Sequence, residues 1–75
     1  MLDKYYVRYI IEDCHVQDIC DIAEIANLWK TGAEHIECFR YYSGHMQNLT
    51  IHTDKKSSAL WLTDFYGNYI EGNAL

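Results

Sequence analysis

Residues 13–32 form the longest stretch of this chain in which apolar side chains recur at a helical spacing. A helix turns once in about 3.6 residues, so a single apolar stripe predicts a helix with one face on a core. The stripe consists of Val16, Ile19, Ile22, Ala23, Ala26 and Trp29. Asp13 is suited to cap the first turn, Lys30 stands in the last turn, and Gly32 can adopt the left-handed conformation that ends a helix. We expect the rest of the chain to pack against this helix.

The opposite side of the expected helix is acidic, and no Lys or Arg occurs between Arg8 and Lys30. Ile25 is expected at the border of this side and Leu28 beside it. One interpretation is an ordinary solvated face with isolated apolar residues. The other is a partner-binding patch with Ile25 and Leu28 as apolar anchors. The patch would comprise Glu12, Asp13, Asp18, Asp21, Glu24, Ile25 and Leu28.

The remaining segments alternate in the manner of strands. Residues 4–12 are expected to turn one set of side chains toward the helix, namely Tyr5, Val7, Tyr9 and Ile11. Further strands are expected near 35–42, 46–53, 59–65 and 69–71. Leu49 and Ile51 should share one face of their strand, and Leu60 and Leu62 should share one face of theirs. The faces of strand 35–42 are not separable from the sequence.

This order predicts an α+β fold, a single compact domain over residues 1–75 with a loose tail at 72–75. The element order is β-α-β-β-β, with a further short strand as an option. The helix would lie across one face of a mostly antiparallel sheet. A chain of this length buries only about 60% of its extended surface, so we expect no internal cofactor cavity.

Charge and cysteine content narrow the class of function. Eleven acidic residues against six basic ones give a net charge of −5, which argues against binding duplex nucleic acid or an anionic membrane. The first residues do not read as a signal peptide, and no apolar run is long enough to span a membrane. Three cysteines, an odd number without disulfide-framework spacing, predict reduced thiols and a cytoplasmic location.

Two groups of residues could in principle bind a metal ion or act as a nucleophile. Cys14, Cys20, Cys38 and His35 could supply a zinc site, but zinc ligands usually come as closely spaced pairs, and His35 and Cys38 would point to opposite faces of a strand. Cys14-His15 at a helix start resembles an activated thiol, yet Glu12 and Asp13 would oppose ionisation. We therefore expect no catalytic residue, no metal and no cofactor, and hence no enzyme.

The leading functional hypothesis is a small acidic protein-binding module. Its partner would be a basic protein that handles nucleic acid, because an acidic strip can occupy a groove meant for phosphate and complementary charge selects partners. In size and acidity the chain is similar in type to phage or mobile-element anti-defence inhibitors, including anti-restriction and anti-CRISPR proteins. That makes inhibitor or adaptor the expected role.

The second hypothesis concerns the sheet face that the helix does not cover, which is richer in aromatic residues than solvation requires. Its expected members are Tyr6, Arg8, Trp61 and Phe65. Such a face could stack the bases of single-stranded nucleic acid while Arg8 and Arg40 contact phosphates. It could equally close a homodimer, and the sequence leaves these alternatives open.

Overall fold

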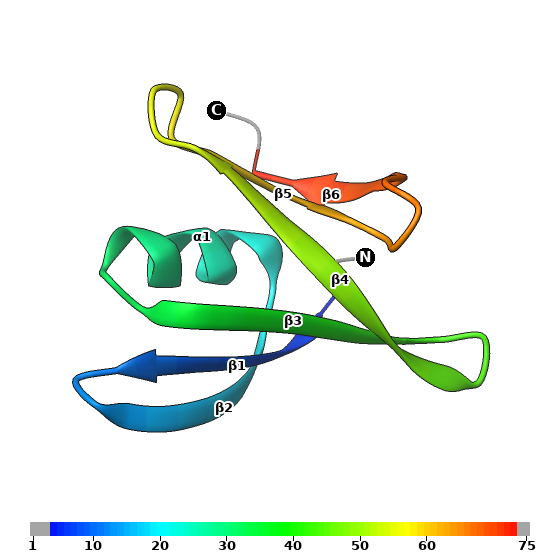
Figure 1. Cartoon of the computed structure of the whole chain (residues 1–75), viewed down its shortest axis with the longest axis horizontal. Helices are drawn as coiled ribbons and strands as arrows, with labels where there is room; N and C mark the ends of the chain where they lie inside the picture. The colour runs from blue at the N-terminus through cyan, green and yellow to red at the C-terminus, as the bar shows by residue number, and fades with distance from the viewer. Residues whose placement is uncertain (1–3, 74–75) are drawn as a thin grey trace.

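The computed structural model describes residues 4–73 of the chain, which form one helix and six strands (Figure 1). The strands join into one antiparallel sheet with the order β2-β1-β3-β4-β5-β6. The elements are β1 (Tyr5–Ile11), β2 (Cys14–Cys20), α1 (Ile22–Lys30), β3 (Glu34–Tyr42), β4 (His45–Asp54), β5 (Ala59–Thr63) and β6 (Tyr69–Gly72). The predicted α+β class, one helix on a mostly antiparallel sheet, is confirmed.

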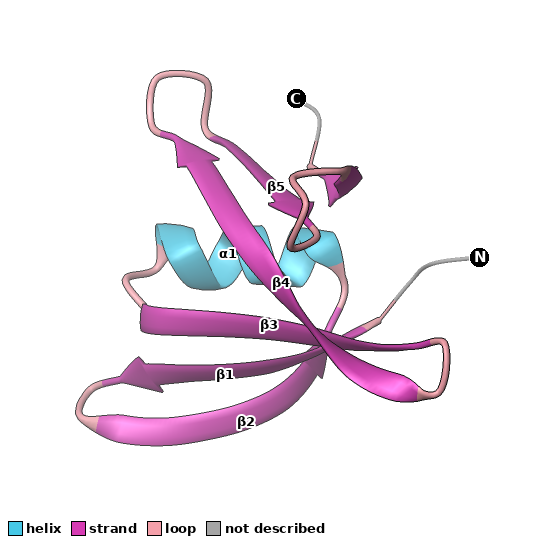
Figure 2. Ribbon diagram, turned by 45° about the vertical axis from the view of Figure 1, so that its right-hand side comes forward, coloured by secondary structure: helices cyan, strands magenta, loops and turns pink. Residues whose placement is uncertain are grey.

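The sheet curls around the helix. β1, β2 and β3 run side by side below α1, β4 crosses them at a steep angle, and β5 and β6 lie on the far side of the helix (Figures 1 and 2). The long β4 pairs with β3 through its first half and with β5 through its second. Strand twist accumulates in this way across an open sheet. As a result, α1 occupies the concave face, and no helix or strand within residues 4–73 covers the convex face.

The core lies between α1 and the concave face. The helix contributes Ile22, Ile25 and Ala26, all buried. The sheet contributes Tyr5, Val7, Cys20, Cys38, Leu49, Leu60 and Leu62. The expected inward directions of Tyr5 and Val7 in β1 are thereby confirmed. Leu60 and Leu62 share the buried face of β5, as their expected common face requires.

The expected helix start at Asp13 is wrong, because residues 14–20 form β2. Every residue of β2 pairs with one of β1, from Tyr5 opposite Cys20 to Ile11 opposite Cys14. Glu12 and Asp13 make a two-residue turn in which φ is 50° and 63°, as a tight hairpin of the type I′ class requires. The hydrogen bonds of a complete β1–β2 hairpin therefore decide the structure of this segment, although Val16 and Ile19 have a helical spacing. Ile19 and Ala23, both expected in the core stripe, are exposed.

The helix instead begins after Asp21, which is its N-cap. The Glu24 N–H donates to Asp21 Oδ1 at 2.8 Å, and the Asp21 N–H donates to Glu24 Oε1 at 3.1 Å. This reciprocal capping box satisfies two amides that the helix itself leaves without acceptors. The expected end is confirmed: Lys30 lies in the last turn and Gly32 has φ +96°.

The predicted loose tail starts too early. Gly72 belongs to β6, and the Leu60 N–H donates to Asn73 Oδ1 at 2.6 Å. The remainder of that tail, residues 74–75, falls outside the part of the chain described. Within residues 4–73, no helix is long and apolar enough to cross a membrane.

Candidate functional site

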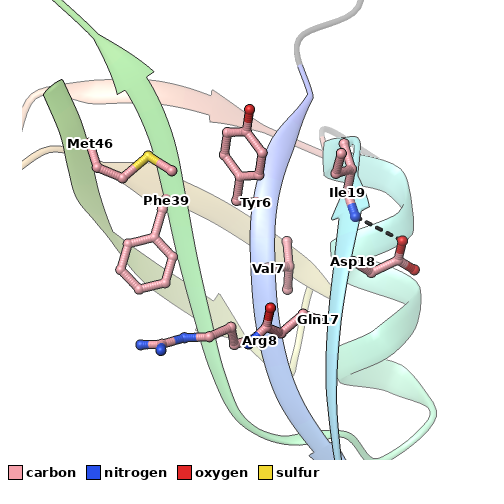
Figure 3. A pocket seen from close by; sticks show the side chains of 8 residues that line it. All are labelled: Tyr6, Val7, Arg8, Gln17, Asp18, Ile19, Phe39 and Met46. Atoms are coloured by element: carbon pink, nitrogen blue, oxygen red, sulfur yellow. Dashed lines mark hydrogen bonds between the residues drawn. The ribbon is translucent and has the colours of Figure 1, made fainter. Parts of the chain in front are cut away.

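A shallow hollow of about 500 Å³ lies on the convex face of the sheet, over β1, β2, β3 and the start of β4 (Figure 3). We call it the outer hollow. Its lining residues are Tyr6, Val7, Arg8, Gln17, Asp18, Ile19, Phe39 and Met46. The pairing register explains the grouping, because Tyr6 stands between Ile19 on β2 and Phe39 on β3. Cross-strand neighbours point to the same face of a sheet.

The outer hollow is predominantly apolar. Tyr6, Ile19 and Met46 are 45%, 54% and 51% exposed, which is unusual for large apolar side chains that lie together. The one cation in the lining is Arg8. Its guanidinium carbon lies 5.0 Å from the centroid of the Phe39 ring, and its Nη2 lies 3.2 Å from Glu37 Oε1. The charge of Arg8 is thus partly balanced on the same face.

The opposite side of β2 is acidic. Asp18 points toward the helix side and borders a second hollow of about 340 Å³ together with Asp21 and Glu24. We call these three carboxylates the acidic margin. Lys4 Nζ lies 3.0 Å from Glu24 Oε1 and 3.9 Å from Asp21 Oδ2. One lysine therefore serves two of the three carboxylates.

Hydrogen bonds favour the ionised form of Glu24. The Asp21 N–H and the Lys4 ammonium both donate to Glu24, and these bonds hold the pKa of Glu24 below its usual value. The bond to Glu24 in turn raises the pKa of Lys4. Asp18 Oδ1 accepts from the Ile19 N–H at 2.8 Å, a contact drawn in Figure 3. The carboxylate of Glu24 is therefore held in its charged form within this margin.

The acidic patch expected on one helix face does not exist as one surface. Asp18, Asp21 and Glu24 lie together, whereas Glu12 and Asp13 occupy the hairpin turn at the other end of β2. Ile25 is fully buried and cannot be the expected surface anchor, because it faces the core. Leu28 is partly buried: it packs against the core and also lines the hollow beside the three carboxylates, as expected. The residues expected on the acidic helix face were wrong because the helix starts at Ile22 and residues 14–20 form a strand.

The aromatic surface is likewise divided. Tyr6 and Arg8 line the outer hollow, but Trp61 lies on β5, where its ring stacks on His52 with centroids 5.3 Å apart. Phe65 lies in the β5–β6 connection and is 85% exposed. Arg40 belongs to the face opposite Phe39, since adjacent strand residues alternate, and its Nε donates to Gln47 Oε1 at 2.5 Å. The two arginines of the nucleic-acid hypothesis therefore do not share a face.

Five of the eight lining residues were not expected at a site: Val7, Gln17, Ile19, Phe39 and Met46. Ile19 was assigned to the helix core, and Phe39 belongs to a strand whose faces alternation alone did not separate. Met46 is the second residue of β4 and lies opposite Tyr41 on β3. Only the pairing of β1 with β3 brings Phe39 beside Tyr6. The Glu12-Asp13 turn was the sequence signal that could have revealed β2.

The thiols lie in separate environments. Cys20 and Cys38 are buried, which raises their pKa to about 11 and about 12, while Cys14 is exposed near the hairpin turn. His35 lies at the start of β3, with φ 53°. Within residues 4–73, no three His, Cys, Asp or Glu side chains are grouped so as to hold a metal ion.

Comparison with protein-family models, with curated proteins and with solved structures finds no match to this chain. Its function therefore has to be inferred from the outer hollow and the acidic margin.

Proposed function

We propose that this protein is a small, non-enzymatic protein-binding module whose partner is basic. The observation that carries the proposal is the placement of the outer hollow and the acidic margin on the two sides of one strand, β2. No element within residues 4–73 covers the outer hollow. A partner seated along β2 would meet apolar side chains on one side and carboxylates on the other.

The two surfaces supply different parts of recognition. Burial of Tyr6, Ile19 and Met46 would provide most of the affinity, since aromatic and methionine side chains are enriched at the centres of interfaces. The acidic margin would speed encounter and select a basic partner more than it adds affinity. This division favours a protein partner over nucleic acid, because phosphate would be repelled by Asp18, Asp21 and Glu24.

The charge suggests what the partner does. Basic surfaces in cells commonly serve to hold nucleic acid, so an acidic module can compete for such a surface. We accordingly propose an inhibitor or adaptor of a nucleic-acid-handling protein. The small size and the net charge of −5 support this role, and the anti-defence type remains a prediction from those two properties.

Affinity capture with matched variants tests the proposal. Tagged wild type, Ile19→Lys and Thr50→Lys would be compared after nuclease treatment and across a salt series. Thr50 is exposed on the convex face of β4 and lies outside the outer hollow, so it controls for the added charge. We expect wild type to capture one basic protein, with capture that persists after nuclease treatment and decreases as salt rises. The purified partner should bind Ile19→Lys about tenfold more weakly than wild type.

The other outcomes contradict the proposal in distinct ways. Recovery of nucleic acid alone, lost on nuclease treatment, would move the function to single-strand binding. Recovery of nothing but the protein itself, with a doubled mass in sedimentation, would identify a homodimer. If Thr50→Lys weakens binding of the purified partner as much as Ile19→Lys does, the outer hollow is not part of the interface.

A further inference from the structure

Within residues 4–73, one long edge of the sheet has no neighbouring strand. This edge is β2, which is the first strand in the sheet order and pairs there with β1 alone. Figures 1 and 2 show it along the outside of the molecule. At seven residues it is longer than β6, the strand at the other edge, which has four. An open edge of this length can pair with another chain.

The register indicates which backbone groups are available. A two-residue hairpin turn closes with a hydrogen-bonded pair, here Ile11 and Cys14, and bonded and non-bonded pairs then alternate along an antiparallel ladder. The N–H and C=O groups of His15, Gln17 and Ile19 consequently point away from β1. The Ile19 N–H is taken by Asp18 Oδ1. Among described residues, the amides of His15 and Gln17 have no such acceptor.

We propose that β2 binds its partner by strand addition, and that the partner supplies an extended segment in which apolar and basic residues alternate. Side chains of an added strand alternate between the faces of the sheet. Those beside Gln17 and Ile19 would enter the outer hollow. Those beside Asp18 would face the acidic margin, where Lys4 pairs with Asp21 and Glu24. The inference rests on the proposed function and specifies its mode of binding.

Charge decides between the possible occupants of the edge. A second copy of the chain would bring two acidic margins and two charges of −5 together, and like charges across a strand pair are destabilising. A basic segment gains from the same carboxylates. Its cations would also compete for the Asp18 carboxylate, which otherwise accepts a hydrogen bond from the Ile19 N–H.

Titration of the isotope-labelled full chain tests strand addition. The probe is a blocked seven-residue peptide of alternating lysine and valine, compared with a peptide of the same composition in block order and with a glutamate–valine peptide. We expect the alternating basic peptide to slow amide exchange at His15 and Gln17. It should bind about tenfold more tightly than either comparison peptide and weaken with salt.

Two variants at one position separate backbone pairing from side-chain contact. Gln17→Pro removes an N–H that points away from β1, a placement that edge strands tolerate, whereas Gln17→Thr retains it. We expect folded Gln17→Pro to bind the peptide about tenfold more weakly than Gln17→Thr, which loses the same side chain but keeps the N–H. The exchange measurement on wild type stands by itself if the proline variant does not fold.

Several results would overturn strand addition. The first is equal binding of the alternating and block peptides, and the second is exchange protection that does not include His15 and Gln17. The third is equal peptide binding by Gln17→Thr and folded Gln17→Pro. If a captured partner binds Ile19→Lys more weakly but binds Gln17→Pro and Gln17→Thr equally well, strand addition is refuted and the proposed function still stands. Binding of the alternating basic peptide, with no natural basic partner captured, would support strand addition and contradict the proposed function.

Discussion

At the scale of single residues, burial separates three cysteines that the sequence presents alike. Cys20 and Cys38 lie in the core, where loss of solvent disfavours the thiolate, and Cys14 is exposed. Only a thiolate reacts readily with an alkylating agent. Reactivity is therefore a direct readout of the folded arrangement.

We predict that iodoacetamide modifies Cys14 alone in the folded protein, and all three cysteines after denaturation. Mass spectrometry of the labelled peptides measures this. Rapid labelling of Cys20 or Cys38 without denaturant would contradict their placement.

The same burial predicts a pH dependence. The folded thiols keep their protons up to about 11 and about 12, while the unfolded chain loses them above the ordinary value of 9.0. The unfolded state thus binds fewer protons in that range, and the free energy of unfolding should fall as pH rises above 9.0. Urea titrations of wild type and Cys38→Ala check this: the variant should lose less stability on going from neutral to alkaline pH.

At the scale of elements, the start of α1 is the decisive feature. Asp21 caps the helix and Glu24 completes the capping box. The Asp-x-x-Glu pattern was readable in the sequence, but the longer apolar spacing from Val16 favoured an earlier start. The strand boundaries near residues 5, 45 and 59 fared better, because alternation and turn residues agreed there.

We predict that Asp21→Ala lowers the free energy of unfolding by about 1 kcal/mol, because an alanine cannot accept from the Glu24 N–H. Asp21→Asn, which can still cap, should cost much less. Urea denaturation followed by circular dichroism measures both. If Asp13→Ala costs helix stability and Asp21→Ala does not, the observed helix start is wrong.

At the scale of the whole molecule, the curl of the sheet brings its distant strands together. Tyr5 Oη on β1 donates to Glu71 Oε1 on β6 at 2.5 Å, although four strand-to-strand steps separate β1 from β6 in the sheet. Tyr5 is 2% exposed, so the bond lies at the edge of the core. It helps hold the second half of the sheet over the helix.

We predict that Tyr5→Phe lowers the free energy of unfolding by about 1 kcal/mol or more, since Glu71 loses a donor in a partly buried place. Tyr6→Phe, on the exposed convex face, should change it by less than about 0.5 kcal/mol. Equal effects in the two variants would show that the bond between β1 and β6 does not stabilise the curl.

The sequence by itself determined the α+β class, most of the strands and much of the core. Alternation in β1 identified Tyr5 and Val7 as inward-facing, because a strand with one buried face must alternate. In β5 it put Leu60 and Leu62 on one common face. Gly32 and Lys30 marked the end of the helix for equally local reasons. The abundance of exposed aromatic residues was also visible.

Tertiary structure alone decided the nature of residues 14–20 and the composition of the site. Val16, Ile19 and Cys20 fit either a helix or a strand, and the choice depended on seven partners in β1. That choice buried Ile25, exposed Ile19, and set Ile19 beside Tyr6 and Phe39. Pairing between strands is a non-local interaction, so its free energy is absent from any single segment of the chain.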